Sequence, residues 1–252
     1  YADAISTLSH CLRLVPGVAS TWFNMGLAYM EHEDYVQALR CFKKAVGISR
    51  HRAVSWLELA MAQNKIDIAH PTVRRSVKVL NLRRAIRSCR RALSLDPGLA
   101  RAWDVMGISY GELGRLKIAS MCLRKAVDID PGYAEAWSNL GSTYVMLSDT
   151  YVGRPRLRRR TLLKSVEACR RSVELDPRMV EAWNTMGVSY MALQELEESL
   201  SSFRRAVSVN PLMAATWMNL SSLYSELGNE EESRRCLLKA QSLGIDLSPI
   251  SA

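Results

Sequence analysis

The sequence predicts an all-α solenoid in which antiparallel helix pairs stack on one another, with about 13 helices in total. Two observations predict it. The six tryptophans recur at a nearly constant interval, and the apolar residues after each of them keep the spacing of one helical face. The composition agrees, because 48% hydrophobic and 23% charged residues in a chain of 252 are typical of a folded protein with a sizeable core. No apolar run is long enough to predict a membrane span.

The tryptophan interval sets the repeat units. Successive tryptophans are separated by 34, 47, 34, 46 and 34 residues. We therefore expect a single solenoid over residues 1–252, with residues 1–18 forming the second half of an additional repeat. The six full repeats are predicted at 19–52, 53–99, 100–133, 134–179, 180–213 and 214–247.

The pattern of apolar residues predicts two helices in each repeat. In the repeat from residue 100, Trp103, Met106 and Tyr110 fall on one helical face, and a second apolar stripe follows the break "GELGR". A proline after Asp or Asn fits the stop between one repeat and the next. These prolines are Pro97, Pro131, Pro177 and Pro211.

A glycine recurs four residues after the tryptophan in four of the units. Glycine costs about 1 kcal/mol relative to alanine inside a helix, so its recurrence needs a compensating reason. We predict that the two helices of a repeat approach too closely there for a side chain. The four positions are Gly26, Gly107, Gly141 and Gly187.

The segments "RAWDVMGISYG", "EAWSNLGSTYV" and "EAWNTMGVSYM" resemble the first half of the tetratricopeptide repeat (TPR). In the units of 34 residues an alanine follows about 23 residues after the tryptophan, at Ala45, Ala126, Ala206 and Ala240, which is also typical of this repeat. The resemblance covers residues 19 to 247. It implies a right-handed superhelical solenoid that is not an enzyme and binds no cofactor. It also implies a scaffold or adaptor that holds an extended peptide or a helix of a partner protein in a concave groove lined by the first helix of each repeat.

On this resemblance, the groove is lined by residues two, five and eight places after each tryptophan. Asparagines at the first of these places bind a peptide backbone in some TPR proteins, whereas the set that clamps a terminal carboxylate is missing here. The alternative is that several of these residues pack between neighbouring helices. The candidate groove residues are Asn24, Leu27, Met30, Met61, Ile108, Asn139, Val188, Met191 and Asn219.

Two insertions carry most of the positive charge. They lie near residues 66–80 and 149–161, between the two helices of their repeats, and residues 68–95 and 152–173 together hold a net charge of +15 in a chain of net +9. We expect the second helices there to begin early, with Pro71 and Pro155 near their starts. The predicted basic ridge comprises Arg74, Arg75, Lys78, Arg154, Arg156, Arg158, Arg159 and Arg160.

Several readings of this ridge stay open. It can be a solvated surface, a site for an acidic protein, or an RNA or DNA site through which the chain acts as an RNA-associated subunit. Aromatic residues are scarce around the arginines, which disfavours recognition of bases. A membrane-binding helix would need an apolar face with Trp or Phe, so we expect no membrane partner.

Catalysis finds little support. The four histidines share no metal-ligand spacing with cysteines or acidic residues, and no nucleotide-binding, zinc-protease or serine-hydrolase motif occurs, so we expect neither a catalytic residue nor a metal site. The six cysteines fall at nearly one depth in the repeats. They read as small buried hydrophobic residues in a reducing, intracellular compartment, the cytoplasm or alternatively the nucleus.

The two ends predict a partner as well. Solenoid ends need polar caps, because an inner repeat exposes apolar surface to its neighbour. We expect two sets of apolar residues to lack full cover: Ile5, Leu8, Leu12 and Leu14 at one end, and Leu220, Leu223 and Leu237 at the other. The expectation is either a longer repeat protein or end-to-end self-association.

Overall fold

The computed structural model describes residues 2–69 and 74–244. This part of the chain forms thirteen α-helices and no strand, which confirms the all-α prediction. The helices are α1 (Ala2–Leu14), α2 (Ala19–Glu31), α3 (Tyr35–Ile48), α4 (Ala53–Ala69), α5 (Arg75–Leu95), α6 (Ala100–Glu112), α7 (Leu116–Ile129), α8 (Ala134–Asp149), α9 (Pro155–Leu175), α10 (Val180–Ala192), α11 (Leu196–Val209), α12 (Ala214–Glu226) and α13 (Glu230–Ser242).

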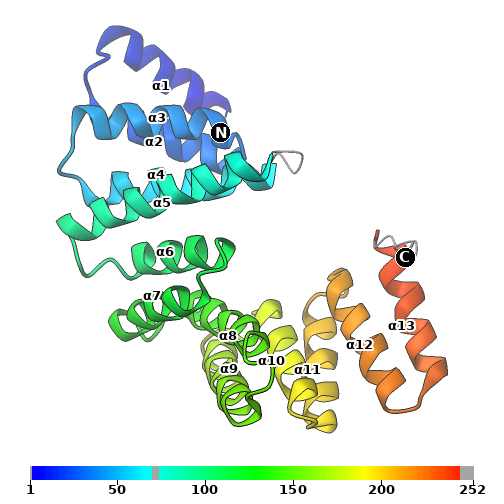
Figure 1. The fold of residues 1–252 in the computed structure, drawn as a ribbon. Helices are drawn as coiled ribbons and strands as arrows, with labels where there is room; N and C mark the ends of the chain where they lie inside the picture. Colours follow the sequence, from blue (N-terminus) through cyan, green and yellow to red (C-terminus); the bar gives the residue numbers. More distant parts are fainter. Residues whose placement is uncertain (1, 70–73, 245–252) are drawn as a thin grey trace. The chain divides into compact units, whose positions relative to one another are not determined.

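The helices pack as consecutive pairs joined by short turns, α2 with α3, α4 with α5, and so on to α12 with α13 (Figure 1). Each first helix of a pair begins at the residue where a sequence repeat begins, namely Ala19, Ala53, Ala100, Ala134, Val180 and Ala214. Pro131 lies in the turn between the end of α7 and the start of α8. Proline cannot continue a helix, so it separates the two.

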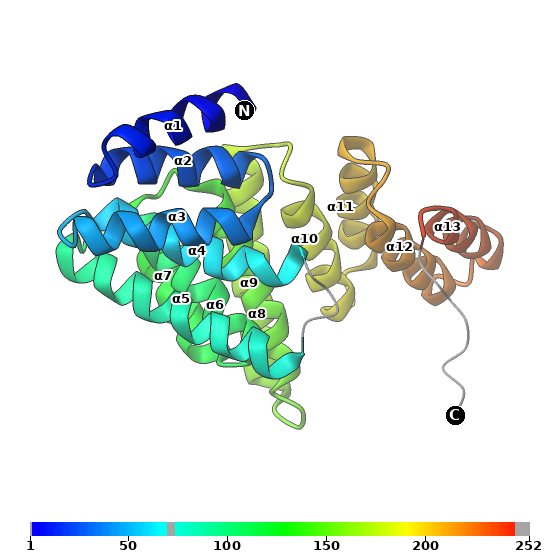
Figure 2. The ribbon, with the colours of Figure 1, turned by 90° about the horizontal axis from the view of Figure 1, so that it is seen from above.

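The chain divides into two compact units, Tyr1–Asp130 and Pro131–Ala252. The N-terminal unit holds α1 to α7, and the C-terminal unit holds α8 to α13 (Figure 1). Within each unit, a second helix also packs on the first helix of the next pair, as α3 does on α4 and α11 on α12. Figure 2 shows the same succession of pairs from above. The boundary lies between the third and fourth repeats.

The core is divided among these interfaces. In the N-terminal unit, Phe23 and Phe42 pack with Leu59, so that one apolar cluster joins α2, α3 and α4. A second cluster joins α4 to α7 and includes Ala60, Cys89 and Met106 among others. A repeat therefore buries its apolar faces only by stacking on its neighbours, as expected for a solenoid.

The tryptophans that set the repeat period all make one hydrogen bond. Each indole Nε1 donates to the backbone carbonyl six residues earlier, at distances between 2.8 and 3.2 Å. In five of the six bonds the acceptor is the proline that precedes the repeat; Trp56 instead uses Arg50. The recurring Pro and Trp are thus parts of one joint that ties the start of a repeat to its first helix.

The recurring glycines lie where the helices of a pair touch, as predicted. A Cβ on Gly107 would lie 2.6 Å from Cγ of the fully buried Leu123, and one on Gly187 would lie 2.6 Å from the ring of Phe203. Gly26 faces Phe42, and Gly141 faces Cys169, at similarly close approach. A side chain at any of the four positions would overlap its neighbour.

The ends differ from the sequence expectation. Leu220 and Leu223 were expected to lack cover, but both are buried, in a cluster with Phe203 and Cys236. The pairing of α12 with α13 supplies this cover, because Cys236 comes from α13. The other end agrees with the expectation in part, because Leu12 is buried against Met25 of α2 whereas Leu14 is 70% exposed.

Candidate functional site

The first helices of the pairs form the inner face of each unit. In the N-terminal unit α2 contacts α4 and α4 contacts α6, and in the C-terminal unit α8 contacts α10 and α10 contacts α12. Among the described residues, α3, α5 and α7 make no such contacts with one another. Successive first helices therefore lie closer together than successive second helices. The stack of pairs must then curve so that the first helices are on its inside. The inner face is therefore the concave one.

In the N-terminal unit, the candidate groove residues differ in exposure. Asn24 and Ile108 are exposed, and the Ile108 side chain keeps 37% of its surface accessible. Leu27 and Met30 are half-buried and pack against the cluster around Phe23, and Met61 packs against the cluster around Met106. Leu27, Met61 and Ile108 occupy equivalent places on three successive inner helices.

In the C-terminal unit, the candidates take part in stacking. Val188 and Met191 pack against the buried cluster of Leu220 and Leu223, so they join α10 to the following pair. Asn219 donates from Nδ2 to Oδ1 of Asn184 at 2.9 Å. The alternative that some groove candidates pack between helices therefore fits Val188 and Met191. Asn139 is half-buried on α8.

Polar side chains link neighbouring inner helices in both units. Asn64 of α4 accepts a hydrogen bond from the Ser109 hydroxyl of α6 at 3.0 Å, and the hydroxyls of Ser142 and Thr185 lie 3.1 Å apart between α8 and α10. These bonds fix the spacing of the inner helices, since a buried polar group without a partner would be costly.

One carboxyl group is buried on this face. Glu58 of α4 is 8% exposed, and burial raises the pKa of its carboxyl group, while the charges of Arg101 and Lys65 partly oppose the rise. Glu58 lies at the place that Asn24 takes on α2, two residues after the tryptophan.

Two exposed apolar residues of the inner helices were missed by the sequence reasoning. Val54 on α4 and Met146 on α8 are both exposed. Val54 lies two residues before its tryptophan, and Met146 lies nine residues after its own. Both offsets fall on the helical face that also holds the residues two and five places after a tryptophan. Extending the 3.6-residue period in both directions would have found them.

All eight residues of the predicted basic ridge are exposed: Arg74, Arg75, Lys78, Arg154, Arg156, Arg158, Arg159 and Arg160. The second helices α5 and α9 begin early, as expected. Each is 21 residues long, whereas α3 has 14 residues. Pro155 opens α9 as its first residue, while Pro71 lies outside the described residues. One insertion belongs to each unit, so a single continuous ridge stays a prediction.

Two members of this set make ion pairs. Lys78 Nζ lies 2.6 Å from Oε2 of Glu112, and Arg158 lies 4.0 Å from Asp149. Such exposed pairs contribute little, typically about 0–1 kcal/mol each. Most of the positive charge is therefore left to solvent or to a partner.

The cysteines follow the sequence expectation with one exception. All six are free thiols; five are buried, but Cys11 is exposed, contrary to the prediction for the set. Burial raises the pKa of Cys89 and Cys169 to about 12, and that of Cys41 and Cys122 to about 11, so these thiols stay protonated. Cys11 lies on α1, and within the described residues the helix that packs on α1 is α2.

The described residues offer no group of three or more His, Cys, Asp or Glu that could hold a metal ion. Within the same ranges, no helix is both long and apolar enough to cross a membrane.

This architecture defines a class of protein, a helix-pair repeat whose inner face is lined by one helix of each pair. Models of the tetratricopeptide repeat match residues 19–51, 100–133, 180–212 and 214–243, together just over half of the chain. The chain belongs to the TPR superfamily. The matched segments are the full repeats without an insertion. Proteins of this family are generally non-enzymatic scaffolds, and the TPR repeats support a role of this chain as a scaffold for protein interactions.

Solved structures share the fold at low sequence identity. The Pseudomonas aeruginosa pilF structure is 17% identical, with a TM-score of 0.69 over 90% of this chain and 91% of that chain. The APC/C hetero-tetramer Cut9–Hcn1 is 14% identical, with a TM-score of 0.75 over 96% of this chain and 43% of that chain. YrrB, described as a TPR protein with an unusual peptide-binding site, is 23% identical, with a TM-score of 0.56 over 82% of this chain and 93% of that chain. A search of curated proteins found no match.

Proposed function

We propose that the chain binds a segment of a partner protein, an extended peptide or a helix, on the inner face of its helix pairs. The observation that carries the proposal is the apolar row Leu27, Met61 and Ile108 on α2, α4 and α6, of which Ile108 is exposed. An apolar row on a concave face offers burial to the apolar side chains of a ligand. The peptide-binding site named for YrrB, a protein of the same fold, also supports it.

The composition of the row indicates the kind of ligand. Methionine and aliphatic side chains adapt to different apolar shapes, so the row favours a ligand with Leu, Ile, Met or Phe at regular intervals. Asn24, exposed on α2, offers an amide to the backbone of an extended segment. The row lies within the N-terminal unit. In the C-terminal unit the equivalent places hold Ser142, Val188 and Ser222, a more polar set.

Ile108→Asp tests the proposal. The side chain is exposed, so the charge should leave helical content unchanged while it repels an apolar ligand. Peptides selected from a random library on the parent chain would be measured against the variant by fluorescence anisotropy. We expect affinity to fall at least about tenfold, the equivalent of 1.4 kcal/mol. Val188→Asp is unsuitable because Val188 packs against the cluster of Leu220 and would unfold its neighbourhood.

Met121→Asp is the matched control. Met121 lies on α7, a second helix of the same unit, and 69% of its surface is exposed. It should keep both fold and affinity. Selected peptides that bind Ile108→Asp as tightly as the parent would place their site elsewhere and overturn the proposal.

A second candidate function is the binding of nucleic acid or an acidic protein through the basic insertions. The observation in its favour is that all eight of their basic side chains are exposed. Replacing Arg156, Arg158, Arg159 and Arg160 with Ser should lower affinity for an RNA oligonucleotide and flatten its salt dependence, because each phosphate contact adds to the salt slope. Binding on the inner face should not change. No RNA binding by the parent chain at low salt would eliminate the nucleic-acid form of this function.

A further inference from the structure

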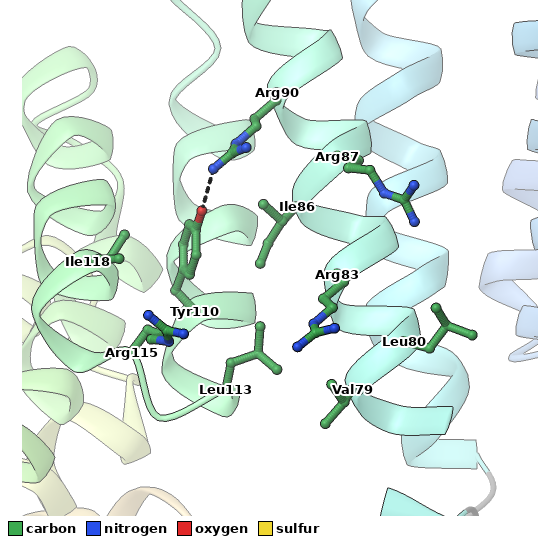
Figure 3. A pocket seen from close by; sticks show the side chains of 10 residues that line it. All are labelled: Val79, Leu80, Arg83, Ile86, Arg87, Arg90, Tyr110, Leu113, Arg115 and Ile118. Carbon is green, nitrogen blue, oxygen red and sulfur yellow. Dashed lines mark hydrogen bonds between the residues drawn. The ribbon is translucent and has the colours of Figure 1, made fainter. Parts of the chain in front are cut away.

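One cavity of the N-terminal unit lies away from the inner face, on the side of the second helices. A cavity of about 730 Å³ lies between α5, the end of α6 and the start of α7 (Figure 3). Figure 3 shows α5 along one side and α6 with the α6–α7 turn along the other, with Arg83 directed from α5 towards Leu113. We call this cavity the arginine pocket.

The pocket exists because α5 is longer than an ordinary second helix. Its early start adds turns that run past the α6–α7 turn, and Val79 and Leu80 from this part line the pocket together with Arg83 of the following turn. The ion pair of Lys78 with Glu112, 2.6 Å long, connects the added turns to the end of α6. The insertion thus contributes part of one wall of the cavity.

The pocket is positively charged. Its lining includes four arginines, Arg83, Arg87, Arg90 and Arg115, and no acidic residue. Arg90 donates to the Tyr110 hydroxyl at 2.8 Å, while the other three make no ion pair with any described residue. Like charges on a concave surface raise the local potential and attract an anion. Guanidinium groups suit carboxylates, which they bind in bidentate geometry.

The pocket is also apolar. Ile86 is buried at its floor, Leu113 is half-buried, and Ile118 of α7 is exposed at 39%. Such a floor would bury aliphatic side chains of a ligand, which a phosphate backbone does not offer. Tyr110 is the single aromatic residue of the lining, so successive bases would lack the row of aromatic side chains on which they stack. The volume of the pocket, its positive charge and its apolar floor together suit a ligand in which one or two aliphatic side chains are flanked by carboxylates.

We infer that the arginine pocket binds an acidic segment of a partner protein, whose aliphatic side chains enter between α5 and the α6–α7 turn. This site is independent of the inner face, because its lining comes from α5, the end of α6 and α7. The repeat with the other insertion offers an internal contrast. Aligned on Cys89 and Cys169, it has Leu163, Glu167 and Glu195 in place of Arg83, Arg87 and Arg115. The basic lining is specific to the N-terminal unit.

The test uses the full chain and an array of short peptides that combine Asp or Glu with Leu, Ile or Phe at all spacings. Each peptide is paired with a version in which Ser replaces the aliphatic residues. The variant Arg83→Glu with Arg87→Glu reverses two charges of the lining. The matched control, Arg84→Glu with Arg91→Glu, makes the same change of net charge on the same helix at exposed residues outside the lining.

We expect a subset of acidic–aliphatic peptides to bind the parent, to weaken with salt, and to lose affinity at least about tenfold in their Ser versions and in the pocket variant. The control variant should retain most of the affinity, and so should Ile108→Asp, which separates this site from the inner face. Equal loss in both charge variants would show a diffuse electrostatic effect and overturn the inference.

Three other results would also overturn it. One is an array in which no peptide binds better than its Ser version. Another is an RNA oligonucleotide that binds the parent and depends on Arg83 and Arg87, while acidic–aliphatic peptides do not. The third is concentration-dependent light scattering of the parent that the pocket variant abolishes, which would make a second copy of the chain the occupant.

Discussion

Two glycines on one helix give a sharp test of the packing. Gly107 and Gly111 both lie on α6, and alanine is the better helix former by about 1 kcal/mol at either place. Their surroundings differ. A Cβ at Gly107 would lie 2.6 Å from Cγ of Leu123 and 3.3 Å from the backbone oxygen of Ala119, whereas one at Gly111 has Ala119 Cβ as its nearest neighbour at 3.9 Å.

The expected effects on stability follow from these distances. Leu123 has no exposed surface, so it cannot give way into solvent, and forcing a methyl group into such packing costs about 1–3 kcal/mol. Against the helix-propensity gain of about 1 kcal/mol, Gly107→Ala should leave the chain less stable by up to about 2 kcal/mol. Gly111→Ala should be neutral or more stable by up to about 1 kcal/mol, because its methyl group meets only an ordinary contact.

Urea denaturation followed by circular dichroism measures both variants against the parent. The order of the transition midpoints should be Gly111→Ala at or above the parent, and Gly107→Ala below it. The slopes should be compared as well, since repeat proteins can lose cooperativity and then the midpoint alone misleads. If Gly107→Ala is as stable as Gly111→Ala, α6 and α7 do not approach as closely as described, and the explanation of the recurring glycines fails.

Three further predictions concern single groups. Trp217→Phe removes the indole donor to the Pro211 carbonyl at 2.8 Å, and should destabilise the chain by about 0.5–1.5 kcal/mol in thermal denaturation; no shift would leave the Trp–Pro joint without energetic weight. Titration with a thiol reagent under native conditions should modify Cys11 fast and the five buried thiols slowly until urea is added; a buried thiol that reacts as fast as Cys11 would contradict the raised pKa values. Because burial raises the pKa of Glu58 in the folded chain, folding favours its protonated form, and the carboxyl group lowers stability increasingly as pH rises from the unfolded pKa through the folded pKa. Glu58→Gln should therefore stabilise the chain at neutral pH, with the gain vanishing in acid, and a gain independent of pH in denaturation curves would show that ionisation is not the cause.

The order and spacing of the helix pairs could be predicted because a tryptophan marks the start of each pair. Trp22 and its five equivalents make the same hydrogen bond to a preceding carbonyl, so their spacing in the sequence is the spacing of the helix pairs. Gly107 could be interpreted for a similar reason. Its cost in helix propensity is known in advance, and close contact with Leu123 is what offsets it.

Exposure at single positions could not be predicted from the repeat pattern. Cys11 and Ala45 occupy equivalent places, eleven residues before the next tryptophan, yet Cys11 is exposed and Ala45 is buried. The reason is that α1 packs on α2, whereas α3 packs on both α2 and α4. Val188 and Ile108 also occupy equivalent places. Val188 packs against the next pair around Leu220, whereas Ile108 keeps its side chain accessible. The pattern fixes the place of a residue within its pair, while its burial depends on the neighbouring pair.

The arginine pocket shows the same limit for function. From the sequence, Arg90 is one of a basic pair that recurs on the outer face of every such helix, and a solvated surface is the expected role. Arg170 and Arg204 fit the repeat equally well, and each makes the same hydrogen bond to a tyrosine twenty residues later. What sets Arg90 apart is the helix on which it lies. The added turns of α5 carry Val79 and Leu80 beyond the α6–α7 turn, where they line a cavity together with Arg83. The α9 extension has the same length, but Glu195 replaces Arg115 at the facing turn, so an equal insertion does not produce the same charge. We therefore expect binding specificity to depend on which side chains face an insertion. The exchange Arg115→Glu gives the N-terminal pocket the glutamate that the C-terminal unit has at this place, and it should weaken the binding of acidic peptides without changing the fold.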